Sequence, residues 1–362
     1  MRSVKQRVHF VRSSDQVDLA WAEAGRGMPL VKASNWLTHL EYDWESPVWR
    51  HWTRFFADHY RYLRYDERGN GMSDWEVGDL SFPRWIGDLE SVVDAAGFTR
   101  PFALLGISQG AATAVAYAVR HPRRVSHLVL YGGYAVGAKK RGDSDMAHLY
   151  EIMQELARLG WGKDNPAFRQ LFTSRFIPEG TEEQVGWFND LCTRATRPDI
   201  GAALICARAE VDARDLLGEV RVPTLVLHAR RDEVVPLSEG ERLARGIPGA
   251  QFALLDSRNH ILLEHEPAWQ QFRQAVLEFT GQDEPAATAG AGNVHDLSRR
   301  EREALALLCK GRSNAQIAWE LGIAEKTVRN HVSHLYEKLG VHSRAEAIVL
   351  AHRQESRRGQ DQ

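Results

Sequence analysis

Up to residue 280, short and almost entirely apolar runs alternate with longer segments whose apolar residues recur at helical spacing. The expected strands are 8–11, 19–22, 30–33, 60–65, 102–106, 125–131, 224–228 and 251–255. The helices expected among them include 82–96, 109–120, 237–245 and 267–279. This alternation predicts an α/β fold with helices on both faces of a mostly parallel sheet. The first two strands are expected to pair antiparallel, and residues 135–218 to form a helical cap over the sheet's C-terminal edge.

The length and composition exclude several classes of protein. A chain of 362 residues, 43% of them hydrophobic and 26% charged, is long enough for about two domains and is unlike collagen-like, disulfide-rich or disordered sequences. No run approaches the ~18 apolar residues of a membrane span, and the first thirty residues lack a signal peptide's apolar core. Cys192, Cys206 and Cys309 have no metal-ligand spacing. We therefore expect a cytoplasmic protein with no membrane contact, metal or cofactor.

A boundary divides the chain near its C-terminal end. Residues 282–295 are rich in Ala, Gly and Pro, so we expect a flexible linker between a domain at 1–281 and a smaller one at 296–362. From 296 to 358 there are twelve Lys and Arg against eight Asp and Glu, a balance of +4, whereas the rest of the chain has −6. A basic small domain is typical of nucleic-acid binding.

The segment Gly106-Ile107-Ser108-Gln109-Gly110 follows an apolar strand and opens an Ala-rich helix. That context is the one a G-x-S-x-G nucleophile elbow requires, because a serine on such a tight turn exposes its hydroxyl above the sheet. The backbone N–H of Gln109 can then face a developing oxyanion. Asp232 and His260 each follow a later strand, so the order Ser, Asp, His occurs at three strand ends.

Together with residues 65–74 (YDERGNGMSD), which are similar to a DxRGxGxSD turn, these features resemble the α/β-hydrolase superfamily. The resemblance covers the first ~280 residues. It implies an α/β-hydrolase fold with Ser108 as nucleophile, His260 as general base and acid, and Asp232 as the residue that orients His260. His228 and His265 are competing histidines, but the first lies inside a strand and the second far beyond one. We interpret the turn at 65–74 as architectural.

One departure concerns the oxyanion hole. Ser34-Asn35 stands where the superfamily usually has His-Gly, so the backbone N–H of Trp36 would have to be the second donor beside that of Gln109. Asn35 is then expected to adopt a backbone conformation that glycine takes more readily. Loss of one oxyanion donor typically costs about 10²–10³ in rate. The triad looks intact, and efficient turnover stays open.

Tryptophan is concentrated near the expected site. Six of the eleven tryptophans fall between residues 36 and 85, and two more lie in the expected cap. Ordinary core packing accounts for at least half of such residues, but some are candidates for the wall of a pocket that takes a small apolar or aromatic molecule. The expected ligand contacts are Asn35, Trp36, Ser108, Trp161, Trp187 and His260.

After the linker, the apolar spacing predicts helices at 298–310, 314–321, 325–339 and 344–352. Ser298 with Glu301 and Ser313 with Gln316 form capping boxes. From Leu297 onward and through residues 311–348 the sequence resembles the LuxR/NarL-type helix–turn–helix. The resemblance implies an all-α, four-helix domain that binds double-stranded DNA, and a homodimer paired through 344–352.

In that domain, residues 325–339 would be the recognition helix, whose N-terminal end suits entry into the major groove. Arg329, Asn330 and Ser333 are expected to contact bases, because arginine and asparagine can bond guanine and adenine edges in a bidentate way. Lys326 and Thr327 are expected to contact the DNA backbone.

Two functions fit these features. The first is a ligand-responsive, one-component transcriptional regulator, in which the hydrolase-like domain is the sensor. The alternative is an active serine hydrolase, an esterase or lactonase, that its DNA-binding tail regulates or localises. The sequence leaves open whether the protein is an enzyme, and a weak serine hydrolase would satisfy both readings.

Overall fold

The computed structural model describes residues 5–161, 166–282, 297–309 and 312–324, together with single residues between 327 and 347. Contacts between Cα atoms divide the chain into two compact units, Met1–Gln282 and Asp283–Gln362. None of the helices within the described ranges is both long and apolar enough to cross a membrane.

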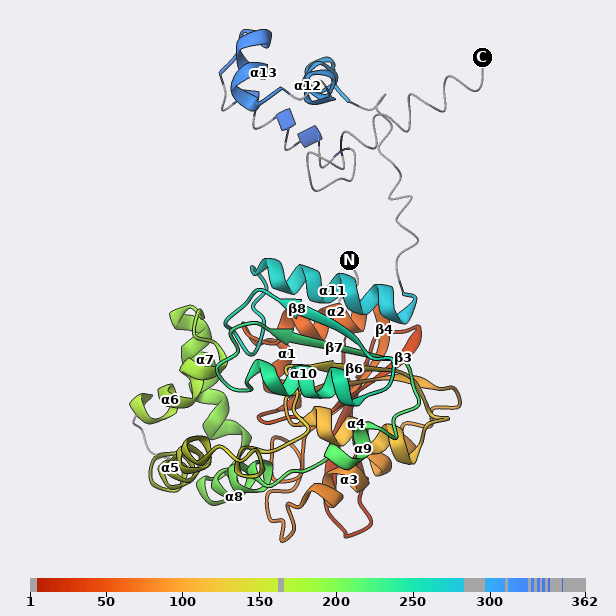
Figure 1. The fold of residues 1–362 in the computed structure, drawn as a ribbon, viewed down its shortest axis with the longest axis vertical. Coiled ribbons are helices and arrows are strands. Elements are labelled where there is room, and N and C mark those ends of the chain that lie inside the picture. Colours follow the sequence, from red (N-terminus) through yellow and green to blue (C-terminus); the bar gives the residue numbers. More distant parts are fainter. Residues whose placement is uncertain are drawn as a thin grey trace. The chain divides into compact units, whose positions relative to one another are not determined.

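The described residues of the first unit form one eight-stranded sheet (Figure 1). Its strands are β1 (Arg7–Arg12), β2 (Asp18–Ala24), β3 (Met28–Ala33), β4 (Tyr60–Tyr65), β5 (Phe102–Ile107), β6 (Val125–Tyr131), β7 (Thr224–Ala229) and β8 (Gln251–Leu255). The spatial order is β1-β2-β4-β3-β5-β6-β7-β8, antiparallel at β1–β2 and β2–β4 and parallel elsewhere. Every expected strand is confirmed to within two residues, because a near-continuous apolar run is what a strand covered on both faces requires.

Helices cover both faces of this sheet (Figure 1). On one face lie α2 (Arg50–His59) and α11 (Pro267–Thr280), and on the other α3 (Phe82–Ala95), α4 (Gly110–Arg120) and α10 (Leu237–Gly246). The short α1 (Leu40–Trp44) and α2 were not predicted. The signal for α2 is present, since Trp52, Phe55 and Phe56 share one helical face and are buried.

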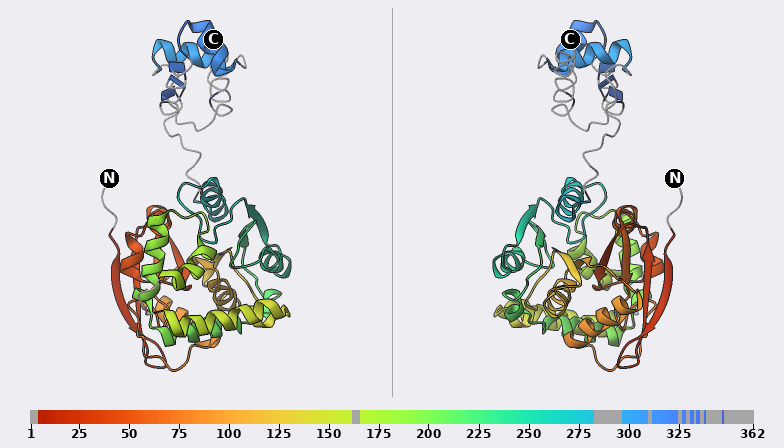
Figure 2. Two further views of the ribbon diagram at one scale, coloured as in Figure 1. Left: turned by 90° about the vertical axis from the view of Figure 1, so that its left-hand side faces the viewer. Right: turned by 90° about the vertical axis from the view of Figure 1, so that its right-hand side faces the viewer.

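The segment between β6 and β7 is mostly helical. It contains η1 (Ala138–Lys140), α5 (Ser144–Gly160), α6 (Pro166–Phe176), α7 (Glu182–Ala195), α8 (Pro198–Ala209) and α9 (Arg214–Leu217). In the left view of Figure 2, which looks from the side of these helices, the yellow-green α5 runs across the front. The insertion therefore supplies side chains that the sheet alone would not bring to its strand ends.

Buried charges hold the turn at 65–74, as its architectural interpretation predicts. Arg68 is 1% exposed and hydrogen-bonds both Asp88 (2.6 and 2.7 Å) and Asp15 (2.7 and 2.9 Å). Asp66 Oδ2 accepts from the backbone N–H of Leu40 at 3.0 Å and of Met72 at 2.9 Å. These bonds connect the turn to β1–β2, α1 and α3.

The described part of the second unit begins with α12 (Arg299–Cys309) and α13 (Asn314–Leu321). Both predicted capping boxes are present, because backbone and side chain bond reciprocally within Ser298–Glu301 and within Ser313–Gln316. The helix α13 ends at Gly322 in the left-handed conformation. A separate apolar core includes Leu305, Leu308, Ile317, Val328, Val332 and Leu335.

Candidate active site

Ser108 lies on the turn between β5 and α4, with a backbone φ of 54°. Among the described residues, Gln16 is the only other non-glycine with a positive φ. The flanking glycines make this turn sterically feasible: a Cβ at Gly106 would lie 2.6 Å from Cα of Ala111, and one at Gly110 would lie 2.8 Å from the carbonyl oxygen of Ser34. A strained serine held by its surroundings is typical of a nucleophile elbow.

Asp232 and His260 meet beyond the ends of β7 and β8. His260 Nδ1 lies 2.7 Å from Asp232 Oδ2, and both side chains are buried. Asp232 Oδ1 accepts from the backbone N–H groups of Val234 and Val235 at 2.8 and 2.9 Å. Burial acts to raise the pKa of Asp232, but the charge of His260 and these hydrogen bonds outweigh it and lower the pKa below its usual value. The carboxylate can therefore orient and stabilise an imidazolium.

The second ring nitrogen of His260 is left without a hydrogen-bond partner among the residues described. Its Nε2 atom is buried and has no hydrogen-bond partner in the part of the chain that the structure describes, Ser108 Oγ included. Gly132 makes room for the ring, because a Cβ there would lie 3.1 Å from His260 Cε1. The ring packs edge-on against Phe176 at 5.4 Å. Ser108 follows β5 and His260 follows β8, with β6 and β7 between these strands in the sheet, and no hydrogen bond between the two side chains completes a triad.

The competing histidines are placed elsewhere. His228 Nε2 lies 3.0 Å from the carbonyl oxygen of Val235 and 3.9 Å from Asp232 Oδ2. His228 is fully buried, and burial lowers its pKa. His265 is exposed. Of the three histidines, His260 makes the short contact with Asp232.

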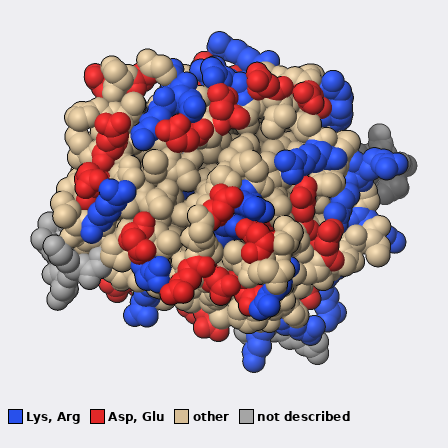
Figure 3. Space-filling view, turned by 90° about the horizontal axis from the view of Figure 1, so that it is seen from below, with Lys and Arg blue, Asp and Glu red and all other residues tan. Residues whose placement is uncertain are grey.

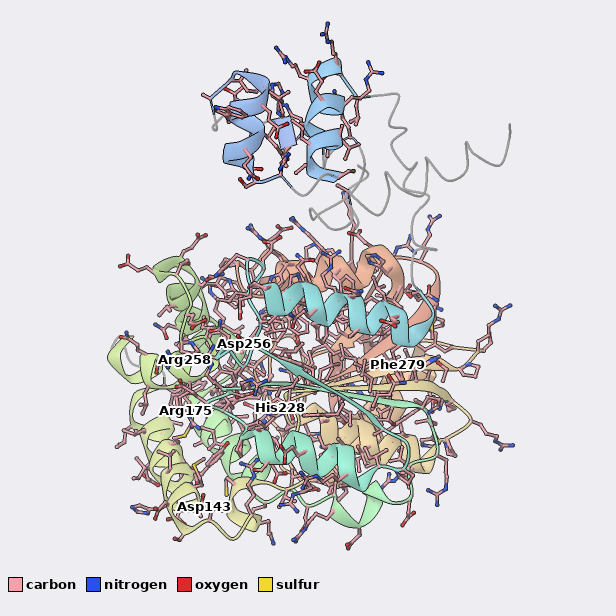
Figure 4. The ribbon with its side chains drawn as sticks, turned by 45° about the horizontal axis from the view of Figure 1, so that its top comes forward. Asp143, Arg175, His228, Asp256, Arg258 and Phe279 are labelled. Atoms are coloured by element: carbon pink, nitrogen blue, oxygen red, sulfur yellow. The ribbon has the colours of Figure 1, made fainter. Side chains whose placement is uncertain are left out.

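A cavity of about 40 Å³ lies beside Ser108. Its walls come from the strand ends and from cap helices. Figure 4 labels Arg175, which belongs to α6 and lines the cavity, and also His228 of β7, which does not line it. The lining residues are Trp36, Ser108, Gln109, Tyr134, Tyr150, Met153, Arg175, Phe176, Ile205, Arg208 and Val234. Across the described ranges, no group of three or more His, Cys, Asp or Glu side chains could hold a metal ion.

The expected oxyanion donors are arranged in an unexpected way. The side-chain oxygen Oε1 of Gln109 accepts a hydrogen bond from the backbone N–H of Trp36 at 3.2 Å. The amide nitrogen Nε2 of Gln109 is buried and has no partner among the described residues. The Trp36 N–H, which is the second expected oxyanion donor, is therefore already bonded to the side chain of Gln109. The backbone N–H of that same Gln109 is the first expected donor.

The expectation for Asn35 was wrong. Its φ is not positive, and its side chain is directed to neighbours rather than to the cavity: Oδ1 accepts from Lys32 Nζ, and Nδ2 donates to the carbonyl oxygen of Trp36 at 3.3 Å. The physical reason is the burial of Lys32, because a buried ammonium needs an acceptor. Burial lowers the pKa of Lys32 to about 8.

Of the expected aromatic contacts, only Trp36 lines the cavity. Trp161 is fully buried behind it, stacked on Trp36 at 5.4 Å, with Nε1 donating to the carbonyl oxygen of Cys192 at 2.6 Å. Trp187 stacks on Tyr42 at 4.8 Å and is not among the lining residues. Sequence reasoning missed Tyr134, which follows the end of β6. It also missed Tyr150, Met153, Arg175 and Arg208, which reach the cavity only because α5, α6 and α8 fold over it.

In the second unit, Thr327 is exposed and its backbone N–H donates to the carbonyl oxygen of Ala324 at 2.9 Å. This is the geometry of a first helical turn. Lys326, Arg329, Asn330 and Ser333 lie outside the described residues.

Two family models match the chain. Residues 50–268, more than half of it, match "Serine aminopeptidase, S33", and residues 295–351 match "Bacterial regulatory proteins, luxR family".

Individual proteins are similar over the first unit. The AB hydrolase superfamily protein YisY of Bacillus subtilis is 27% identical over 70% of this chain and 92% of its own length. A 2-hydroxy-6-oxononadienedioate/2-hydroxy-6-oxononatrienedioate hydrolase of Paraburkholderia phymatum is 31% identical over 54% of this chain and 67% of its own. The crystal structure of a hydrolase from Pseudomonas aeruginosa superposes with a TM-score of 0.63 and 27% identity, covering 76% of this chain and 98% of that one.

Proposed function

The chain belongs to the α/β-hydrolase superfamily and carries a C-terminal LuxR-type helix–turn–helix domain, and on that premise we propose that it is a one-component transcriptional regulator whose hydrolase-fold domain senses a small molecule. The family of the C-terminal domain supports DNA binding. The bond from the Trp36 N–H to Gln109 Oε1 carries the sensor proposal. A cavity beside Ser108 whose oxyanion donor is already engaged is better suited to holding a molecule than to turning it over.

The proposed ligand has an apolar or aromatic body, because Trp36, Tyr134 and Phe176 contribute large rings to the cavity wall. Its occupancy would alter how paired C-terminal domains engage double-stranded DNA. We propose a homodimer, paired through residues 344–352, that works in the cytoplasm, where such a regulator meets its DNA.

The second candidate function is serine hydrolysis. The strained Ser108 and the 2.7 Å contact between His260 and Asp232 favour it, and relatives over this unit are named as hydrolases. The two functions combine if slow acylation of Ser108 is the signal.

Replacing Ser108 by alanine separates the two functions. We expect Ser108→Ala to lower 4-nitrophenyl acetate hydrolysis to the residual level that the pocket alone supports, since the nucleophile is gone. Native mass spectrometry of protein purified from its own host should still find the same non-covalently bound molecule in both proteins. Loss of the bound molecule from Ser108→Ala, or a covalent adduct on Ser108 in the wild type, would mean that a reaction at Ser108 is part of signalling.

The expected DNA contacts are tested by a matched pair of variants. We expect Arg329→Ala to cost about 1–3 kcal/mol on a specific site and to relax one base preference, because it removes a base contact. Thr327→Ala should weaken binding evenly across sequences, because it removes a backbone contact. Fluorescence anisotropy on a specific and a scrambled duplex measures both. An unchanged base preference in Arg329→Ala would contradict the assignment.

The face of the hydrolase-fold unit that Figure 3 shows lacks the charge pattern of a DNA-binding surface. On the face that Figure 3 shows, Lys and Arg side chains are interspersed with Asp and Glu rather than gathered into a basic field. Nucleic-acid binding through phosphates needs a concentrated positive surface. We propose that the C-terminal domain contacts DNA, as its family supports.

A further inference from the structure

Arg208, in α8, lines the cavity beside Ser108 and is 5% exposed. One guanidinium nitrogen, Nη2, donates to Glu67 Oε2. The other two, Nε and Nη1, are buried and have no hydrogen-bond partner within the described part of the chain. A buried guanidinium with unused donors is unfavourable by itself, and in native proteins such groups usually have an acceptor.

Aromatic rings hold this guanidinium and leave its edge free. Cζ of Arg208 lies 5.0 Å from the ring centroid of Trp36 and 5.7 Å from that of Trp85. A cation over an aromatic face is stabilised through that face, whereas the five N–H donors point outward in the guanidinium plane. Trp36 also lines the cavity, so the cation is held against its wall.

The nearest charge compensates Arg208 only in part. Glu67 is its ion-pair partner and also accepts from Asn70 Nδ2 at 3.2 Å. Burial lowers the pKa of Arg208 and raises that of Glu67, because both members of the pair are removed from water. An additional acceptor that entered from the cavity would stabilise the charged form of Arg208.

The second arginine of the cavity has no such shortage. Arg175 donates from Nε and Nη2 to the carbonyl oxygen of Glu233 at 3.1 and 2.7 Å, and its Nη1 lies 3.2 Å from Met153 Sδ. All three of its nitrogens are therefore engaged. Of the two lining arginines, Arg208 is the one with donors to spare.

We propose that Arg208 is an anion-binding residue of this cavity and that the molecule bound there is a carboxylic acid, with its carboxylate on Arg208 and its apolar body against the aromatic wall. This inference rests on the proposed ligand-binding function and deepens it. A carboxylate matches the planar fork of a guanidinium better than any neutral group of the same size does. Ser108 shares the cavity, so the same molecule lies beside the hydroxyl.

The test compares acids with their uncharged amides on the full-length protein. Phenylacetate and phenylacetamide are one pair, and hexanoate and hexanamide are another. Intrinsic tryptophan fluorescence, to which Trp36 in the cavity wall contributes, reports occupancy, and isothermal titration calorimetry is the second readout. We expect the wild type to bind each acid at least tenfold more tightly than its amide, because only the acid provides a charged acceptor.

Four variants locate this preference. Arg208→Met should weaken the acid at least tenfold and leave the amide unchanged. Arg208→Met alone leaves the Glu67 carboxylate buried without its cation. The double variant Arg208→Met/Glu67→Gln removes both charges and should likewise weaken the acid and leave the amide unchanged. Arg175→Met is the matched control and should keep the preference. Glu67→Gln alone should bind the acid at least as tightly as the wild type, since it removes a competing carboxylate.

Equal affinity for acid and amide in the wild type overturns the inference, as does an acid preference that survives in the double variant. A preference that disappears in Arg175→Met but not in Arg208→Met also overturns it. If neither member of any pair binds the wild type, the proposed sensing function fails, and this inference fails with it. Loss of the acid preference alone is therefore distinguishable from loss of all ligand binding.

Discussion

Replacing Gln109 by methionine is expected to raise 4-nitrophenyl acetate hydrolysis by about 10²–10³-fold, the usual effect of one oxyanion donor. Gln109 Oε1 holds the Trp36 N–H at 3.2 Å, and methionine fills a similar volume without a strong acceptor. The freed N–H could then bond the oxyanion that forms when Ser108 attacks. Steady-state kinetics should show the gain in kcat, because the interaction exists only in the transition state.

Gln109→Glu is the matched control. It keeps an oxygen on the Trp36 N–H and adds a negative charge next to the expected oxyanion, so the rate should not rise. The double variant Ser108→Ala/Gln109→Met should lose the whole gain. Slower hydrolysis by the Gln109→Met variant would mean that Gln109 supports the loop at Trp36 rather than occupying its donor, and the main support for a sensor would be lost.

Replacing Arg68 by methionine is expected to lower the free energy of unfolding by about 3–5 kcal/mol, the typical cost of removing one partner of a buried ion pair. Arg68 and Asp88 are each 1% exposed in their side chains, and Asp88 would be left buried without its cation. Asp15 would lose the partner that holds its pKa well below the usual range. Urea unfolding followed by tryptophan fluorescence is the measurement, since ten of the eleven tryptophans lie in residues 1–282.

Arg12→Met is the control for Arg68→Met. Arg12 also bonds an aspartate, Asp18, at 2.8 Å, but the two side chains are 59% and 42% exposed. Exposed pairs contribute at most about 1 kcal/mol. Equal losses in the two variants would show that the buried cluster is not what anchors the turn at 65–74.

Local patterns in the sequence were sufficient for the sheet and the elbow. Strand β5 is a continuous apolar run. Gly106 and Gly110 flank Ser108, and the tight turn has no room for a Cβ atom at either position. The capping boxes at Ser298 and Ser313 likewise depend on residues three positions apart. Such features follow from backbone sterics and hydrogen bonding within a few residues, so they can be recognised without knowing what packs around them.

The C-terminal family and the Ser–Asp–His order were also readable from the sequence. The contacts that decide which polar groups of the site are already bonded were not readable from the sequence. Gln109 engages the Trp36 N–H across 73 positions of the chain, and Arg208 reaches the Ser108 cavity from a helix 100 positions away. Trp187, expected at the cavity, stacks on Tyr42 instead.

These partners are chosen by how separate elements pack, because a side chain's neighbours across an interface depend on rotamers and volumes that no local pattern contains. The sequence by itself determined the α/β scaffold, the serine on its elbow and the type of DNA-binding domain. Only the tertiary structure decided which donors around that serine are engaged and which cation is left with donors to spare.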